Sequence, residues 1–367
     1  PLVAGFQPTM QYRLRGNITL GVIGLTVHAP HLYDLFGVHV PDYRDTARRW
    51  VEQFTRQGIR PIVVVSHLGI REDRLLAEAV PEIDVIIGGH SHTLLPEGEW
   101  VNGVLIAQAG NYAEGLGRVD LALNPLTGAV LSASATVLSI PVDTPPDPAV
   151  DAAVREAEAE AIEFLKQPVG ELKEPLDQDF FGECGIGNLA ADALRERMDA
   201  EAALLTSGLF TADLPSGTVT LGELDGACFT TANPQVSALR GEQIVAALER
   251  GLEPEMMNSV LKVFRGAPVG LPVVSGMTIT YHPRAANGRR IEKILVQGQP
   301  LQPDRIYRVA HTDAEVHERD SQYGYLELEP GQLLKTEVPT ILREVIADYL
   351  KAHGPMSRPD GGRWQSD

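Results

Sequence analysis

The chain contains 367 residues, of which 44% are hydrophobic and 22% are charged, and its formal net charge is −18 with a pI of about 5.0. This length allows two domains of ordinary size. The negative charge disfavours a general surface for nucleic-acid polymers or anionic membranes, because its long-range field repels polyanions. It still permits a small phosphorylated substrate, since bound metal ions invert the local field.

The first part of the chain alternates between apolar runs typical of strands and segments with helical spacing. In chain order the predicted elements are strand 17–27, helix 42–58, strand 62–65, a helix near 72–79, and strands 84–87, 103–109 and 116–123. Helix 42–58 begins at Asp42 and has Gly58 as its stop. Strand, helix, strand, helix, strand predicts a βαβ layout and a mainly parallel sheet.

A proline-rich segment, DTPPDP at 143–148, separates this part from the rest. The segment 149–167 follows it with apolar residues on one side, which predicts an interdomain helix. Further helices are predicted at 187–198 and 339–352, among short strands. The predicted boundaries are a first domain at 1–145, a linker helix at 146–168, a second domain at 169–354 and a loose tail at 355–367.

The two cysteines, Cys184 and Cys228, lie far apart in the sequence. Two buried free thiols are expected, and a disulfide between them is the alternative. No run of 18 apolar residues is present, so no membrane span is expected. The chain starts at Pro1 without methionine, so the missing signal peptide is weak evidence and the compartment stays open.

Two of the apolar runs lead into histidine. Residues 62–65 lead into SH at 66–67, and residues 85–87 lead into GGHSH at 88–92. Strand ends in an α/β sheet are where sites usually form, and neutral imidazole is a common ligand of transition metals. The predicted metal ligands are His67, His90 and His92. The alternative is that they are polar loop residues with ordinary hydrogen-bond partners.

The strings SHLGI at 66–70 and DVIIGGHSHT at 84–93 resemble the calcineurin-like metallophosphoesterases, specifically the 5′-nucleotidase family. The likeness extends to GNLAADALR at 187–195 and SGMTITY at 275–281. It implies an α/β fold class, with an incomplete metallophosphoesterase sandwich domain joined by a helix to an α+β C-terminal domain of 5′-nucleotidase type. That C-terminal domain would bind the substrate.

The resemblance also implies chemistry. Two divalent metal ions (Zn, Mn, Fe or similar) would be bound, one by His67 and His90 and the other with His92. The implied function is hydrolysis of phosphate esters, with nucleotides as substrates of a 5′-nucleotidase or 2′,3′-cyclic phosphodiesterase. The C-terminal domain would hold the rest of the substrate across a cleft spanned by helix 148–166.

The family begins with Asp-x-His, Gly-Asp and Gly-Asn-His-Glu or Asp motifs, and none of them occurs in this chain. They supply the bridging aspartate and the catalytic histidine, so no catalytic residue is predicted here. We expect the chain to lack the N-terminal part of its metal domain, to hold few or no metal ions and to have little or no activity. An exposed apolar sheet edge would favour a homodimer or a retained N-terminal fragment.

The second domain departs from the family too. The family's Asn-x-Gly-Gly-Ile-Arg loop is here TSGLF at 206–210, and its Gly-Gly-Asp-Gly-Tyr motif is SQYGY at 321–325. Aromatic rings could still stack on a base, and an arginine could replace the lost cation. The candidate substrate contacts are Phe264, Arg265, Tyr323, Tyr325 and Asn111. Core packing is the alternative for the aromatic residues, and a plain turn for Asn111.

Other polar residues are expected to be structural. Asp34, Asp42 and Asp73 are predicted at turns or helix starts, Arg240 at the surface, and His311 as a structural histidine. No Gly-x-Ser-x-Gly elbow or P-loop is present, which removes support for a serine hydrolase or P-loop NTPase. The alternative functions are a non-catalytic nucleotide- or partner-binding protein on the same scaffold, and a metal-dependent hydrolase of another ester or a sulfur-containing analogue.

Overall fold

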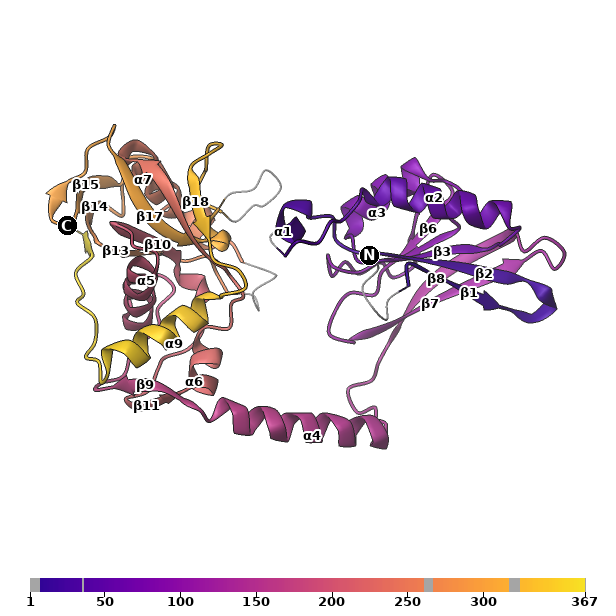
Figure 1. The fold of residues 1–367 in the computed structure, drawn as a ribbon, viewed down its shortest axis with the longest axis horizontal. Helices are drawn as coiled ribbons and strands as arrows, with labels where there is room; N and C mark the ends of the chain where they lie inside the picture. The colour runs from indigo at the N-terminus through magenta and orange to yellow at the C-terminus, as the bar shows by residue number, and fades with distance from the viewer. Residues whose placement is uncertain (1–6, 35, 261–266, 317–323, 367) are drawn as a thin grey trace. The chain divides into compact units, whose positions relative to one another are not determined.

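The computed structural model describes residues 7–34, 36–260, 267–316 and 324–366 (Figure 1). The chain divides into two compact units, Pro1–Pro146 and Asp147–Asp367, and each has its own hydrophobic core. Both mix helices with sheets, so the predicted α/β class is confirmed. Among the described residues no helix is both long enough and apolar enough to cross a bilayer.

The main sheet of the first unit has the strand order β1-β2-β3-β4-β6-β5. These strands are Thr9–Arg13 (β1), Thr19–Leu25 (β2), Ile62–Ser66 (β3), Val85–Ile87 (β4), Val104–Ala107 (β6) and Glu99–Val101 (β5). β2, β3, β4 and β6 pair in parallel, while β1 and β5 flank them antiparallel. The carboxyl ends of the parallel strands therefore meet at one edge, and β1 is an edge strand of the sheet.

Two layers cover this sheet (Figure 1). The helices Tyr43–Arg56 (α2) and Ile70–Ala79 (α3) lie on one face, and the hairpin of Gly115–Leu123 (β7) and Val130–Ser139 (β8) lies on the other. A short helix, Pro30–Asp34 (α1), and a 3-10 turn, Arg15–Asn17 (η1), complete the unit. The histidine-bearing loops thus emerge from a sheet that is packed on both sides.

Helix α2 forms as the sequence predicts. The carboxylate of Asp42 accepts hydrogen bonds from Arg44 N at 2.9 Å and Asp45 N at 3.1 Å, which satisfies amide groups at the helix start. Phe54 on its buried face is 1% exposed, and burial of such a ring contributes about 1.5–3 kcal/mol. A Cβ on Gly21 would lie 2.6 Å from Phe54 Cδ2, so β2 needs glycine where this ring packs.

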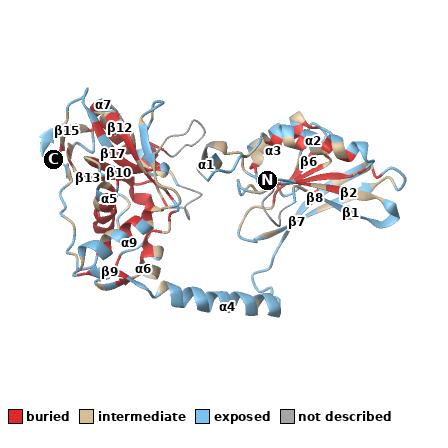
Figure 2. Ribbon diagram, in the orientation of Figure 1, coloured by how far each residue is buried: buried red, intermediate tan, exposed pale blue. Residues whose placement is uncertain are grey.

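Helix α4, Pro148–Leu165, begins the second unit. Asp147 caps it by accepting from Ala149 N at 2.9 Å, and Pro148 occupies its first turn, where the missing N–H costs nothing. None of its described side chains is buried, and Figure 2 shows it in pale blue along its length. Val154 and Phe164 on its apolar side are 48% and 58% exposed.

Within its described residues, the second unit is built on two larger sheets and a strand pair. The sheet β13-β10-β17-β12-β18 consists of Pro272–Ser275, Ala202–Thr206, Ile306–Thr312, Pro234–Arg240 and Leu333–Thr336. The sheet β16-β15-β14-β19 consists of Gln299–Pro300, Ile291–Val296, Met277–Tyr281 and Trp364–Ser366. The pair β11-β9 consists of Gly217–Thr220 and Pro168–Leu172.

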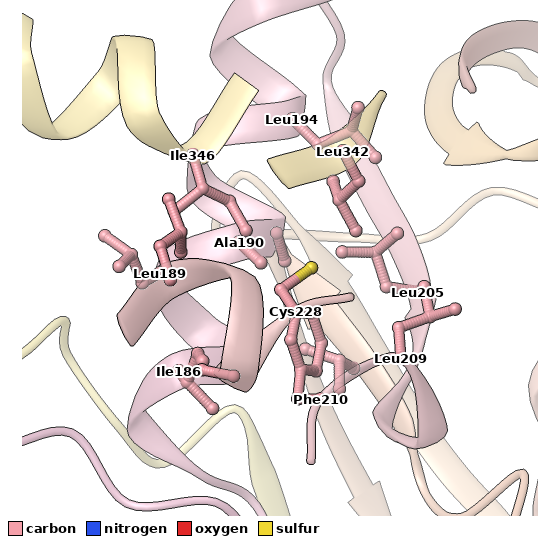
Figure 3. Close-up of a cluster of buried hydrophobic side chains, with 14 of the residues drawn as sticks. Ile186, Leu189, Ala190, Leu194, Leu205, Leu209, Phe210, Cys228, Leu342 and Ile346 are labelled. Atoms are coloured by element: carbon pink, nitrogen blue, oxygen red, sulfur yellow. The ribbon is translucent and has the colours of Figure 1, made fainter. Parts of the chain in front are cut away.

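Helices fill the spaces around these sheets. They are Gly185–Arg197 (α5), Leu221–Ala227 (α6), Gly241–Gly251 (α7), Pro254–Met257 (α8) and Leu342–His353 (α9), with 3-10 turns at Ser207–Leu209 (η2) and Asp313–Glu315 (η3). Figure 3 shows Leu189 and Leu194 of α5 packed near Leu342 and Ile346 of α9. The predicted helices at 187–198 and 339–352 therefore form the core of this unit.

Both cysteines are buried and free, as expected. Cys228 lies in the cluster of Figure 3, and burial raises the pKa of its thiol to about 12. A thiol that stays protonated in this way is an inert apolar side chain.

The predicted loose tail is wrong for its last residues. Trp364–Ser366 pair in parallel with β14, and Trp364 Nε1 donates to Pro272 O at 3.0 Å. Arg363 donates to Asp192 Oδ2 and to Val274 O, both at 2.7 Å. Polar composition suggested a solvated segment, but an arginine with a partly buried acidic partner anchors it to the unit.

Candidate functional site

The three predicted metal ligands lie at the carboxyl edge of the parallel strands. His67 directly follows β3, and the segment 88–92 directly follows β4. Hydrogen bonds continue past the strand ends, from His67 N to Leu25 O at 2.9 Å and from Gly88 N to Ala107 O at 2.8 Å. The loops therefore leave the sheet in register, and their histidines are exposed to solvent.

Two of these histidines face each other. The ring centroids of His67 and His90 are 5.1 Å apart at an interplanar angle of 62°. The ring of His92 lies beside Tyr112 instead, with centroids 6.3 Å apart. Within the described residues, no group of three or more His, Cys, Asp or Glu side chains is placed to hold a metal ion. The imidazole pair fits a divalent transition metal by its donor chemistry, but a complete site usually has three or four protein ligands.

The backbone of this loop is strained. His90 has φ 67° and His92 has φ 53°, in the left-handed region that non-glycine residues rarely adopt. Tyr112 and Ala113, in the loop after β6, have φ 55° and 56°. Each such residue costs on the order of 1–3 kcal/mol, and strain of this kind concentrates at functional sites. No pattern in the sequence indicates these conformations.

His90 is held in the protonation state that binds metals. Partial desolvation of the ring lowers the pKa of His90, and the neighbouring His67 and His92 lower it further. His90 is therefore neutral near pH 7, with a lone pair free for a ligand bond.

Asp73 is a buried residue of the site that sequence reasoning placed only at a helix start. It lies in the first turn of α3 and is 0% exposed. Ser66 Oγ donates to Asp73 Oδ1 at 2.5 Å and accepts from Leu68 N at 3.1 Å, so Asp73 braces the turn that carries His67. Its Oδ2 has no hydrogen-bond partner in the described part of the chain, and burial raises the pKa of Asp73 to about 6. The available signal was its spacing from the buried Leu76 and Ala77, which places all three on one helix face.

Gly88 fits tightly against this carboxylate. A Cβ at Gly88 would lie 2.5 Å from Asp73 Oδ2 and 3.0 Å from Gln108 Nε2. Gly88→Ala is therefore expected to push the loop off the strand end and to lower the free energy of unfolding by about 1–3 kcal/mol, the usual cost of overpacking. Denaturant unfolding of the chain measures this loss.

Gly24→Ala is the matched control, because the nearest atom to a Cβ there is Pro8 O at 3.9 Å in the same sheet. It should cost clearly less. Equal losses for the two variants would show that the contact at Gly88 is not the reason.

The candidate substrate residues have different outcomes. Phe264, Arg265 and Tyr323 lie outside the described residues. Tyr325 is 1% exposed and its hydroxyl donates to Leu205 O at 2.9 Å, so it is a core residue and the stacking role predicted for it is wrong. Asn111 lies in a turn after β6, at the same sheet edge as the histidines, and remains a prediction.

The loop at 206–210 is buried rather than open to a ligand. Ser207 is 0% and Phe210 is 0% exposed. A Cβ on Gly208 would lie 2.2 Å from Pro268 O, so the loop packs directly on backbone. Residues 206–210 are thus part of the core, which sequence comparison with a substrate loop did not anticipate.

The residues expected to be structural behave as such. His311 is fully buried and bonds to Ser237 Oγ at 2.8 Å, and burial lowers its pKa to about 4. Arg240 forms ion pairs with Glu242 and Glu329 at the surface. Asp34 is the last residue of α1.

Comparison with known proteins finds similarity to phosphoesterases. Residues 168–322 match the 5′-nucleotidase C-terminal domain family. The chain is 30% identical over 302 residues to the uncharacterized metallophosphoesterase YunD of Bacillus subtilis, covering 82% of this chain and 65% of YunD. It is 29% identical over 328 residues to the trifunctional nucleotide phosphoesterase protein YfkN of the same organism, covering 84% of this chain and 22% of YfkN.

A solved structure supports the same fold. The 5′-nucleotidase precursor from Thermus thermophilus is 25% identical, with a TM-score of 0.53, and the match covers 99% of this chain and 75% of that chain.

The chain spans only part of the curated relatives that it matches. It covers less than two thirds of the length of YunD and about a fifth of that of YfkN.

Proposed function

We propose that the first unit contributes to a divalent-metal centre that hydrolyses phosphate esters. The proposal starts from two similarities: residues 168–322 match the 5′-nucleotidase C-terminal domain family, and the chain is homologous to a metallophosphoesterase. The observation that carries the proposal is the exposed pair of His67 and His90 at the carboxyl edge of a parallel sheet, with their rings in edge contact and with His90 at positive φ. Nucleotides are the proposed substrate class, following the names of the relatives YfkN and the Thermus 5′-nucleotidase.

His67 and His90 would hold one ion through their imidazole nitrogens, and His92 would contribute to a second. When bound, such ions stabilise charge on the phosphoryl oxygens and lower the pKa of the attacking water. The chain's own residues fix the donors: Asp73 braces the turn at His67, and Ser91 Oγ accepts from Ile70 N at 3.0 Å, which ties the second loop to the start of α3.

One observation favours the second candidate, a non-catalytic nucleotide- or partner-binding protein. The segment 206–210 lacks the family's arginine and is buried, and Tyr325 is a core residue. The residues that the family uses to hold a nucleotide for turnover are therefore altered, which favours a protein without turnover and, within this candidate, a partner rather than a nucleotide as the ligand. Catalysis and binding must be measured separately.

The test uses protein expressed from its complete reading frame. It is assayed on AMP, on 2′,3′-cyclic AMP and on a generic aryl phosphate, before and after chelation and again after addition of Mn²⁺ or Zn²⁺. We expect turnover of a nucleotide ester that chelation abolishes and metal restores. Turnover that survives complete metal removal would refute the metal centre, and nucleotide binding without turnover would favour the second candidate.

A further inference from the structure

The side chain of Gln108 spans the loop that carries two of the histidines. Gln108 directly follows β6 and is only 4% exposed. Its Oε1 accepts from Thr93 N at 2.6 Å and from Ser91 Oγ at 2.9 Å, while its Nε2 donates to Gly89 O at 2.8 Å. One side chain therefore joins the entry and the exit of the segment 89–93.

The backbone around Gln108 supports the same segment. Gln108 O accepts from Leu95 N at 2.9 Å, and Gly110 N donates to Thr93 O at 3.0 Å. Leu94 and Ala109 form an isolated bridge between these hydrogen bonds. The chain leaving the loop is thus fixed against the chain leaving β6, and Gln108 lies at the point where its side chain can reach back across the loop.

The strain in the loop requires such a restraint. His90 and His92 are both held at positive φ, which a free loop of non-glycine residues would relax. A glutamine is suited to this position because it offers an acceptor and a donor on one planar group. Glutamate would keep the contacts to Thr93 N and Ser91 Oγ but would present a second acceptor to Gly89 O.

We propose that Gln108 is a positioning residue for His90 and His92. Its side chain orders the segment 89–93 and so orients both imidazoles for binding of a divalent ion. The metal-binding role of this ordering rests on the proposed function. The ordering of the segment 89–93 by Gln108 does not depend on it. Removing a residue that orients metal ligands through hydrogen bonds typically weakens metal affinity by about 10–100-fold.

The experiment compares Gln108→Leu, Gln108→Glu and a control. Asp84→Ala is the matched control, because Asp84 also accepts a backbone hydrogen bond between neighbouring strands, from Ile62 N at 2.8 Å, but at the opposite edge of the sheet. Two quantities are measured on the protein from its complete reading frame. They are the hydrogen–deuterium exchange of residues 88–93 without metal, and Co²⁺ affinity from the visible spectrum.

We expect Gln108→Leu to raise exchange in residues 88–93 and to weaken Co²⁺ binding by about 10–100-fold, with Gln108→Glu in between. Asp84→Ala should leave both quantities within about twofold of wild type even where it lowers the melting temperature equally. Unchanged exchange and affinity in Gln108→Leu would overturn the proposal, and so would equal losses in the control. A wild-type protein that binds no Co²⁺ would instead refute the proposed function, and the exchange data would still decide whether Gln108 orders the loop.

Discussion

If the proposed function holds, replacing His90 by alanine is expected to lower phosphoester turnover by at least about 100-fold in protein expressed from its complete reading frame, because a proposed metal ligand is lost outright. His90 is the residue whose ring faces His67 at 5.1 Å, and its lowered pKa leaves it neutral near pH 7. No neighbouring acidic or sulfur ligand among the described residues completes a group that could replace it. Steady-state rates at saturating metal, on the best substrate found, measure the effect.

The matched control is His353→Ala. His353 belongs to the second unit and bonds to Glu196 Oε1 at 2.9 Å, so its removal also deletes an imidazole with a polar partner. It should retain most of the wild-type rate. Comparable losses in the two variants would show that the His90 effect reflects general damage, and full activity in His90→Ala would remove His90 from the metal centre.

The stability of the second unit should depend on pH through two buried groups, Glu315 and His311. Their contributions to the free energy of unfolding change in opposite directions as the pH rises. Glu315 is 0% exposed and accepts from Thr206 N at 2.9 Å and from Thr312 N at 2.7 Å. Burial outweighs these bonds and raises its pKa from 4.5 to about 7. Protonation of Glu315 therefore contributes stability that is full below pH 4.5 and is lost as the pH rises through about 7.

His311 acts in the other direction. Burial lowers its pKa from 6.5 to about 4, so the folded unit holds it neutral. Its contribution is full above pH 6.5 and is lost as the pH falls through about 4. Between about pH 4.5 and 6.5 the two dependences partly cancel.

Glu315→Gln should isolate the contribution of His311 to the pH dependence of the free energy of unfolding. The free energy of unfolding of this variant should fall more steeply than that of wild type as the pH drops from about 7 to about 5, by about 1 kcal/mol per pH unit. Urea unfolding of the full chain is measured at several pH values, with amide exchange within residues 168–366 as the signal. This signal reports the stability of the second unit by itself. Parallel curves for the two proteins would contradict the shifted pKa of Glu315.

Much of the fold follows from local patterns. The helices α2, α4 and α5 and the strands β2 and β3 form where apolar spacing or apolar runs predict them, because these signals are carried by residues close in sequence. The hairpin partner β8 was not predicted. Its partner contacts on β7 and its packing on the sheet are decided by residues outside its own segment.

The site was only partly predictable, for a similar reason. The strand-end positions of His67 and His90 follow from the parallel sheet, and the structure brings these two together. The positive φ of His90 and the bond from Ser66 to Asp73 depend on contacts between segments that no local pattern contains, although helical spacing does place Asp73 on the buried face of α3. The same holds for the tail, where Arg363 bonds to a residue 171 positions earlier in the chain.

Metal content is the measurement that tests the account most directly. Protein from the complete reading frame is loaded with Mn²⁺ or Zn²⁺, passed through gel filtration and submitted to elemental analysis, together with His90→Ala. The account predicts that the wild-type protein retains divalent metal in stoichiometric amount and that His90→Ala loses at least part of it. Wild-type protein that retains none, or a variant that retains as much as wild type, would contradict a metal centre built on these histidines.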